Sequence, residues 1–196
     1  MEDFQTKLEK VIDETFKILR TNNSGTRIVF PTYRDFSHRV SEQELRFVFV
    51  EQVQELLKEY DYFYSVETPT KDKYRFSLNK NYTSPRVDES GKSASFDLSI
   101  VDKSNKTIAI IEFKAKNADP HEYAKDLCKL WNSNEKSLYK YLLNLFEKIE
   151  PKTKKHFFDK LNPSQNKWLE AKKSEEKVVV IAQSLRDNDE RIREEI

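Results

Sequence analysis

The stretches SFDLSIV (residues 95–101) and TIAIIEFK (residues 107–114) decide the fold of this 196-residue chain. Both are rich in β-branched and aromatic residues and have the length of a strand. The segment between them, DKSNK (102–106), is polar and typical of a tight turn. The two stretches therefore predict an antiparallel hairpin, and the neighbouring segments are interpreted as the elements that pack around it.

Ionisable residues end one face of the second strand. Side chains two positions apart share a face of a strand, so Ile110, Glu112 and Lys114 point the same way. Ionisable groups at the end of a buried apolar face need a partner or a chemical purpose, because burying them alone is costly. This face is therefore the first candidate for a functional site.

The turn decides which residue of the first strand faces Glu112. If residues 104–105 form a two-residue loop, Asp97 lies directly opposite, with Cβ atoms about 4.5–5.5 Å apart. A longer turn would keep the same face but shift the pairing. Opposed carboxylates repel, and Mg²⁺ or Mn²⁺ between them would remove the repulsion, since such ions prefer oxygen ligands. Lys114, one step further along, would orient water and stabilise developing negative charge, so the pattern predicts metal-dependent phosphodiester hydrolysis.

Asp97 followed by Glu112-Phe113-Lys114 resembles the signature of the PD-(D/E)XK nuclease superfamily, which has the restriction-endonuclease-like fold. The resemblance covers roughly residues 41–183, because the order of the predicted elements also agrees. It implies that Asp97 and Glu112 bind a divalent metal ion and that the Phe113 carbonyl completes the metal's shell. It further implies that Lys114 assists the attacking water. One departure is Phe96, which stands where the family usually has proline.

The resemblance also implies a catalytic glutamate from the first helix of this core. A capping box at Ser41, with Glu44 three residues after the cap, predicts that this helix begins there and runs to Tyr60. Glu44 is the first choice for the site. Glu51, seven residues later on the same helix face, is the second choice, and Glu42 is the remaining candidate.

The other segments predict one α/β domain, in which a mixed sheet of about four or five strands is flanked by helices. The nuclease-like core spans residues 41–183, and residues 1–25 form a helical extension. Helices are expected at 2–20, 41–60, 120–131 and 138–149, with shorter helical pieces around 157 and 168. Strands are expected at 62–67, 73–78, 95–101, 107–114 and 177–182, with a short edge strand at 28–30. Residues 79–92 are expected to form a loop, and the charged tail from 186 is expected to fray.

The N-terminal helix at 2–20 carries an apolar stripe that allows two interpretations. It packs on its own domain, or it pairs with a second copy of the chain in a homodimer. The stripe is shorter than the three or four heptads of a typical coiled coil, which favours packing within the chain.

Basic residues near the hairpin are the candidates for binding nucleic acid. Lys116 and Asn117 follow the Glu-x-Lys motif after Ala115, and Lys125 lies on the next predicted helix. Further along, residues 151–177 are rich in lysine. Aromatic residues alternate with the lysines in and just before this region: Tyr139, Tyr141, His156, Phe157 and Trp168. The pattern predicts a footprint for the DNA backbone with stacking groups, and the alternative is a solvated helix face.

Composition excludes several other classes of protein. Charged residues make up 35% of the chain and apolar residues 37%, but 13 Phe, 9 Tyr and 2 Trp are too many for a disordered chain. Only two glycines occur, which leaves no room for a P-loop or a dinucleotide-binding fingerprint. A single cysteine, Cys128, excludes an internal disulfide and predicts a reducing, cytoplasmic location. The three histidines lack the spacing of a zinc site, and no segment has the roughly 20 apolar residues of a membrane span.

These observations predict a metal-dependent nuclease that acts on DNA. The resemblance adds a role in bacterial defence or mobile-element biology. The first alternative is a non-catalytic module of the same fold that binds nucleic acid or a protein partner. The second alternative is a structural or dimerisation module in which the acidic pair is incidental.

Overall fold

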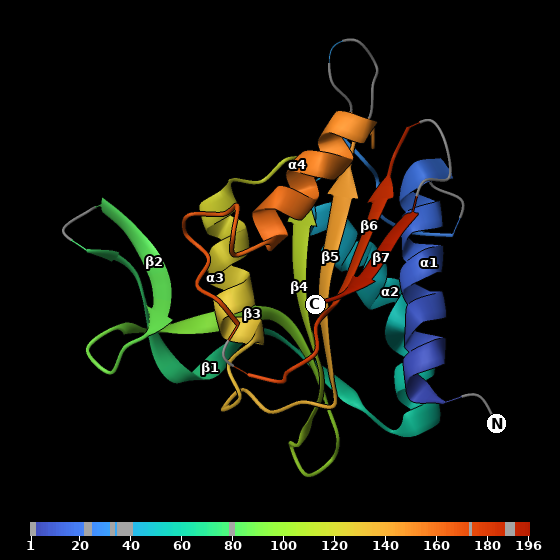
Figure 1. The fold of residues 1–196 in the computed structure, drawn as a ribbon. Helices are drawn as coiled ribbons and strands as arrows, with labels where there is room; N and C mark the ends of the chain where they lie inside the picture. The colour runs from blue at the N-terminus through green and yellow to red at the C-terminus, as the bar shows by residue number, and fades with distance from the viewer. Residues whose placement is uncertain are drawn as a thin grey trace.

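The computed structural model describes residues 3–21, 25–31, 34, 41–78, 81–172, 174–186 and 191–196. Within them lie four helices and seven strands (Figure 1). The helices are α1 (Phe4–Thr21), α2 (Glu42–Tyr60), α3 (Pro120–Leu130) and α4 (Pro151–Leu161). The strands are β1 (Phe63–Leu78), β2 (Asn81–Val87), β3 (Lys92–Val101), β4 (Thr107–Ala115), β5 (Tyr139–Phe146), β6 (Val179–Ser184) and β7 (Arg191–Glu195).

The strands form one mixed sheet of order β2-β1-β3-β4-β5-β6-β7. β4, β5 and β6 run parallel to one another, and the remaining neighbours are antiparallel. The expected α/β class is confirmed, but the expected four or five strands are wrong because the sheet has seven. The unexpected strands are β2, β5 and β7, which lie where a loop, a helix and a fraying tail were expected.

Helices cover both faces of the sheet. α1 and α2 lie on one side, and α3 and α4 lie on the other (Figure 1). β4 contributes to both hydrophobic clusters, because Ile111 and Phe113 face α1 and α2 while Ile110 faces α3. None of the described helices is long and apolar enough to cross a membrane.

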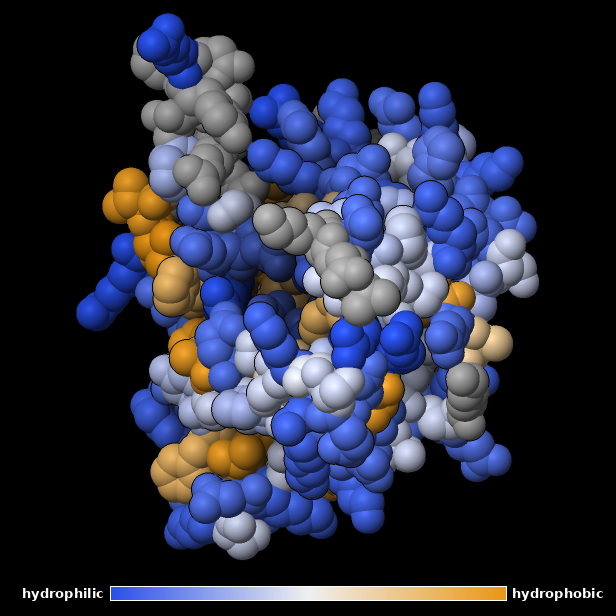
Figure 2. All heavy atoms as spheres, turned by 90° about the vertical axis from the view of Figure 1, so that its left-hand side faces the viewer, coloured by the Kyte–Doolittle hydropathy of each residue, from blue (hydrophilic) through white to orange (hydrophobic). Residues whose placement is uncertain are grey.

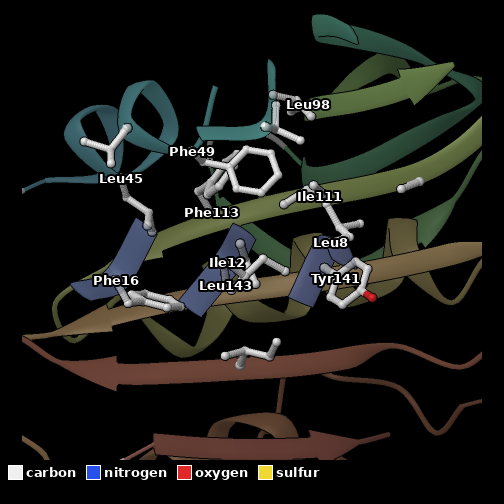
Figure 3. Close-up of a cluster of buried hydrophobic side chains, with 14 of the residues drawn as sticks. Leu8, Ile12, Phe16, Leu45, Phe49, Leu98, Ile111, Phe113, Tyr141 and Leu143 are labelled. Carbon is white, nitrogen blue, oxygen red and sulfur yellow. The ribbon is translucent and has the colours of Figure 1, made fainter. Parts of the chain in front are cut away.

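The apolar stripe of α1 is buried within the chain. Leu8, Ile12 and Phe16 pack beside α2 and over the middle of the sheet (Figure 3). Phe4, at the start of the helix, makes edge-to-face ring contacts with Tyr60 and Tyr62. α1 therefore packs on its own chain. The apolar stripe that a dimerisation helix would need is covered by the core of the same chain.

The predicted capping box starts α2. The main-chain N–H of Ser41 donates to the Glu44 carboxylate at 2.7 Å, and the Ser41 side chain accepts from the N3 backbone. The helix ends at Asp61, whose φ of 57° is left-handed. Phe49 on the buried side of α2 lies 5.6 Å from the Phe113 ring, so α2 packs directly over the Glu-x-Lys strand.

The register expected for the β3–β4 hairpin is confirmed, but the expected two-residue loop is wrong. Leu98 pairs with Ile111, as required when Asp97 lies opposite Glu112. The turn is longer, because Asp102 accepts hydrogen bonds from two later main-chain N–H groups. A β-bulge near the end of β3 offsets this extra length, so the body of the hairpin keeps its register.

The helix expected at 138–149 is wrong, because this segment contains strand β5. All positions of β5 after Tyr139 are buried. Tyr141 and Leu143 face the cluster under α1 and α2, whereas Leu142 faces the cluster under α3 and α4. A central parallel strand is apolar on both faces, and periodicity cannot distinguish such a run from a buried helix.

β1 and β2 extend beyond the rest of the sheet as a curved two-stranded arm (Figure 1). The two strands expected at 62–67 and 73–78 are one continuous strand, and β2 pairs with its end. We use "the arm" for residues 74–78 of β1 together with β2. The arm folds against α3.

Three smaller expectations also fail. Residues 28–30 form no strand, and the Ile28 N–H donates to the Thr26 side chain instead. The piece around Trp168 is a turn because Asn166 accepts hydrogen bonds from its N–H groups. The tail forms β7, which pairs with β6 and buries Ile192 beneath α4 and its neighbours.

Candidate active site

The Asp97 carboxylate is attached to the main chain of the Glu-x-Lys motif. The observed β3–β4 pairing extends to Leu98 and Ile111, and beyond it the Phe113 N–H donates to Asp97 Oδ2 at 2.8 Å. Asp97 Oδ1 lies 3.9 Å from Arg46 Nη1, on α2. The side chain of Asp97 therefore extends the hairpin ladder and points toward the space beneath α2.

Glu112 is buried, with 1% of its surface exposed. Its Oε1 accepts from Lys129 Nζ, on α3, at 2.5 Å. Burial raises the pKa of Glu112 well above its usual value, and the nearby carboxylates of Asp126 and Asp97 raise it further, against the opposing effect of Lys129. Burial is the largest of these causes, so Glu112 is a carboxyl group whose ionised form depends on the cations beside it.

Lys114 is buried at the end of β4 among several oxygen atoms. Its Nζ lies 2.6 Å from Asp126 Oδ2 and 3.4 Å from Glu42 Oε1, and it donates to the Phe113 carbonyl at 3.2 Å. Burial alone would lower the pKa of Lys114, but the carboxylates of Asp126, Glu42 and Glu112 outweigh burial and raise it. Lys114 is therefore held as an ammonium ion.

Asp126 joins the two lysines and was not predicted from the sequence. It lies one helical turn before Lys129 on α3, and its Oδ1 is 3.2 Å from Lys129 Nζ. Burial alone would raise the pKa of Asp126, but the ammonium groups of Lys129 and Lys114 outweigh it and hold the pKa below its usual value. An Asp and a Lys three residues apart on a helix are common, so the sequence carried only a weak signal for this pair.

The structure brings Glu42, rather than Glu44 or Glu51, to this site. The Glu44 carboxylate binds Ser41 in the capping box. The Glu51 carboxylate accepts from Thr26 and from the Arg27 N–H, away from the site. Glu42 lies in the first turn of α2, where its pKa is raised by burial and by Asp97 and Asp126, against the opposing effect of Lys114.

We call the assembled group the ionic cluster. Its members are Glu42, Asp97, Glu112, Lys114, Asp126 and Lys129. It combines four carboxylates with two lysines, which leaves two negative charges in excess when every group is ionised. Arg46 at its edge does not remove this excess, because it also pairs with Glu67 at 2.7 Å.

The donor set of the cluster fits a hard divalent cation. Asp97, Glu112 and the Phe113 carbonyl offer oxygen atoms, and an excess of two negative charges matches one such ion. Among the described residues, no group of three or more His, Cys, Asp and Glu side chains could hold a metal. Two carboxylates are the number through which Mg²⁺ is usually held in proteins, because this ion keeps several of its waters.

The residues predicted to bind nucleic acid lie near the exit of β4 and on α3. Lys116 has a φ of 62°, and its N–H donates to the Leu145 carbonyl. The Asn117 side chain accepts from Lys160 of α4. Lys125 pairs with Glu122 at 2.8 Å and lies 5.7 Å from the Phe76 ring of the arm. All three positions adjoin the elements that carry the ionic cluster.

Most of the aromatic residues predicted to stack on bases serve the core instead. Tyr141 and Phe157 are buried, and Tyr139 is half-buried beside Phe4. His156 is exposed and Trp168 is half-buried.

The sequence analysis missed an aromatic group between the arm and α3. Tyr82 of β2 stacks on His121 with ring centroids 4.2 Å apart, and Trp168 meets His121 edge-on at 5.3 Å. His121 Nε2 lies 3.1 Å from the carbonyl oxygens of Phe76 and Thr83, so this nitrogen carries the proton. Tyr82 remains 61% exposed, which leaves it accessible to a planar ligand.

Comparisons of the chain with family models, with curated proteins and with solved structures found no match.

Proposed function

We propose that this protein is a metal-dependent nuclease of the PD-(D/E)XK type that acts on DNA. The observation that carries the proposal is the attachment of Asp97 to the Glu112-Phe113-Lys114 strand by the 2.8 Å hydrogen bond to Phe113. That contact brings two carboxylates and a lysine from neighbouring strands to one buried end of the sheet. A solvated surface hairpin would not bury Glu112 and Lys114 in this way.

The order of elements supports the same proposal. A helix (α2) precedes the antiparallel strands β1, β3 and β4, and then come helix α3 and the parallel strand β5. Asp97 lies on β3 and the Glu-x-Lys motif lies on the adjacent β4. The resemblance implies this first helix, the antiparallel strands, later helices and a final buried strand at 177–182, which is β6. β5 lies where a second helix was expected, and α1 and β7 lie outside the core of residues 41–183.

In the proposed hydrolysis, each residue of the ionic cluster has its own role. Asp97, Glu112 and the Phe113 carbonyl would hold Mg²⁺ or Mn²⁺, which when bound neutralises charge on the phosphate and makes water a better nucleophile. Lys114 holds its proton and provides a fixed positive charge where negative charge develops on the phosphate. Glu42, at the more exposed edge of the cluster, is placed to accept a hydrogen bond from an entering water.

The arm side of the molecule supports DNA as the partner. Figure 2 shows this side as mostly hydrophilic, with hydrophobic side chains in separate groups rather than in one continuous patch. Where the arm meets α3, Lys125 lies over the Phe76 ring, and the exposed Tyr82 stacks on His121, one helical turn before Lys125. A cation beside an exposed aromatic ring suits a phosphate backbone with an accessible base.

Replacing Tyr82 with alanine is expected to weaken the binding of single-stranded DNA. The loss of one stacked base corresponds to about 1–3 kcal/mol. Fluorescence anisotropy with a labelled oligonucleotide in EDTA measures the affinity without cleavage. The matched control is Tyr64→Ala, since Tyr64 is also an exposed tyrosine of this sheet but lies outside the arm. Equal affinities for wild type and Tyr82→Ala would remove Tyr82 from the DNA interface.

The second candidate function is a non-catalytic module of the same fold that binds nucleic acid. The contact between Lys129 and Glu112 favours it, because an ammonium ion already neutralises the buried carboxylate. In a catalytic protein the same lysine would compete with a metal ion for Glu112. Cellular location and a role in defence or mobile elements stay predictions.

Incubation with DNA distinguishes the two functions. Supercoiled plasmid and short single-stranded DNA are each incubated with the purified protein in Mg²⁺, Mn²⁺ or EDTA. We expect cleavage with metal and none in EDTA, and Glu112→Gln should be inactive. Glu44→Gln is the matched control and should keep its activity, because the Glu44 carboxylate belongs to the helix cap. DNA binding without cleavage under any metal condition would favour the non-catalytic module.

A further inference from the structure

Lys129 of α3 lies between the carboxylates of Glu112 and Asp126. Its Nζ lies 2.5 Å from Glu112 Oε1 and 3.2 Å from Asp126 Oδ1, and it donates to the Ser95 carbonyl at 2.8 Å. All three partners are oxygen atoms, and Lys129 itself is buried. An ammonium ion surrounded by two carboxylates and a carbonyl has the ligand chemistry of a bound hard cation.

Phe96 helps to hold Lys129 in this position. The Lys129 ammonium lies 5.5 Å from the centroid of the Phe96 ring, within the range of a cation–π interaction. Phe96 is the residue that stands in place of the usual proline before Asp97. The departure from the family pattern and the lysine on Glu112 are therefore parts of one local arrangement.

Lys129 is poorly placed to bind a phosphate itself. Its ammonium is buried among carboxylates, so an approaching phosphate would meet negative charge first. The Lys129 ammonium already lies against Glu112 Oε1, so a metal ion on the same carboxylate would bring a second positive charge beside it. The lysine and the metal ion therefore compete for the negative charge of Glu112. If Lys129 moves away from Glu112, Asp126 and Ser95 can keep its charge satisfied.

We propose that Lys129 is an internal counter-ion that occupies the metal position on Glu112 and competes with the divalent cation for it. It is a positioning residue and makes no contact with the reacting atoms. In the metal-free protein it stabilises a buried carboxylate that would otherwise lack a cation. Metal entry requires the Lys129 ammonium to withdraw toward Asp126, so the lysine sets the metal concentration at which the site fills. This inference rests on the proposed function.

The test is a titration of the metal-free protein with Mn²⁺ in an isothermal titration calorimeter, which measures the affinity for the ion. Lys129→Met keeps most of the side-chain volume but removes the charge. We expect it to bind Mn²⁺ about tenfold more tightly than wild type, at the low end of the changes that residues beside metal ligands produce. Lys129→Arg keeps the charge and should bind no more tightly than wild type.

Two further variants serve as controls. Lys125→Met removes a lysine from the same helix whose partner is Glu122, and it should bind Mn²⁺ as wild type does. The double variant Glu112→Gln with Lys129→Met has neither charge and should lose the tight site. If Lys129→Met is unfolded without metal, circular dichroism during the Mn²⁺ titration should show that the metal restores the fold.

The outcomes separate this inference from the proposed function. Unchanged or weaker Mn²⁺ binding by Lys129→Met overturns the inference, even if wild type cleaves DNA. Failure of Mn²⁺ to refold an unfolded Lys129→Met also overturns it. Tight binding by Lys129→Met combined with no binding by wild type supports the inference, but it contradicts a metal-dependent activity of the natural protein.

Discussion

Replacing Lys114 with alanine is expected to reduce metal-dependent DNA cleavage by about 10²–10³-fold, the typical effect of removing one group that stabilises developing charge. The Lys114 ammonium is fixed by Asp126 at 2.6 Å and by the Phe113 carbonyl at 3.2 Å, so its charge is in place before substrate binds. The measurement is the rate of plasmid cleavage at saturating Mg²⁺.

A readout of metal binding separates a catalytic defect from a loss of structure. Lysine is not an oxygen ligand, so Lys114→Ala should keep a metal-dependent rise in melting temperature. The matched control is Lys58→Ala, which removes a lysine paired with Glu55 on α2, outside the proposed DNA interface. Cleavage by Lys114→Ala within a few-fold of the wild-type rate would exclude Lys114 from the mechanism.

Replacing Asp126 with alanine is expected to lower the free energy of unfolding by about 3–5 kcal/mol, because it leaves two buried lysines without a shared partner. Asp126 lies 2.6 Å from the Lys114 ammonium and 3.2 Å from that of Lys129, and only 4% of it is exposed. Chemical denaturation at neutral pH measures the loss.

The pH dependence of the same variant gives a second check. The pKa of folded Asp126 is lowered, because the two ammonium groups outweigh the effect of burial. Its stabilisation is therefore fully present above the pKa of the unfolded chain and is lost as the pH falls through the lowered, folded pKa. The difference in the free energy of unfolding between wild type and Asp126→Ala should therefore become smaller in acid.

Glu122→Ala is the matched control for stability. Glu122 is an acidic residue of the same helix, but its pair with Lys125 is more exposed and should contribute no more than about 1 kcal/mol. If Asp126→Ala costs no more than Glu122→Ala, the ionic cluster does not stabilise the fold. In that case the two lysines find water or other partners when Asp126 is absent.

The sequence alone predicts the parts of the fold that local chemistry dictates. The capping box at Ser41 requires only residues three apart, and it starts α2 as predicted. The pairing of β3 with β4 follows from a turn and two apolar strands that adjoin in the chain. These contacts join near neighbours in sequence, so pattern and turn chemistry are sufficient to predict them.

A segment that is buried on both faces is apolar throughout, so its sequence pattern does not distinguish a strand from a helix. The β5 segment is predicted to be a helix because Leu138, Leu142 and Leu145 follow helical spacing. Its position between β4 and β6 makes it a strand. β2 and β7 were missed for the opposite reason. They are polar edge strands whose pairing with β1 and β6 depends on partners elsewhere in the fold.

The candidate site divides in the same way. Asp97, Glu112 and Lys114 could be predicted because one hairpin brings them together, and the Asp97 bond to Phe113 lies within that hairpin. Asp126 and Lys129 reach Glu112 only because α3 packs against the sheet. The sequence by itself determined that Asp97, Glu112 and Lys114 come together on one hairpin. The tertiary structure alone decided their counter-ions, because the energy of a buried charge depends on whichever groups the fold brings beside it.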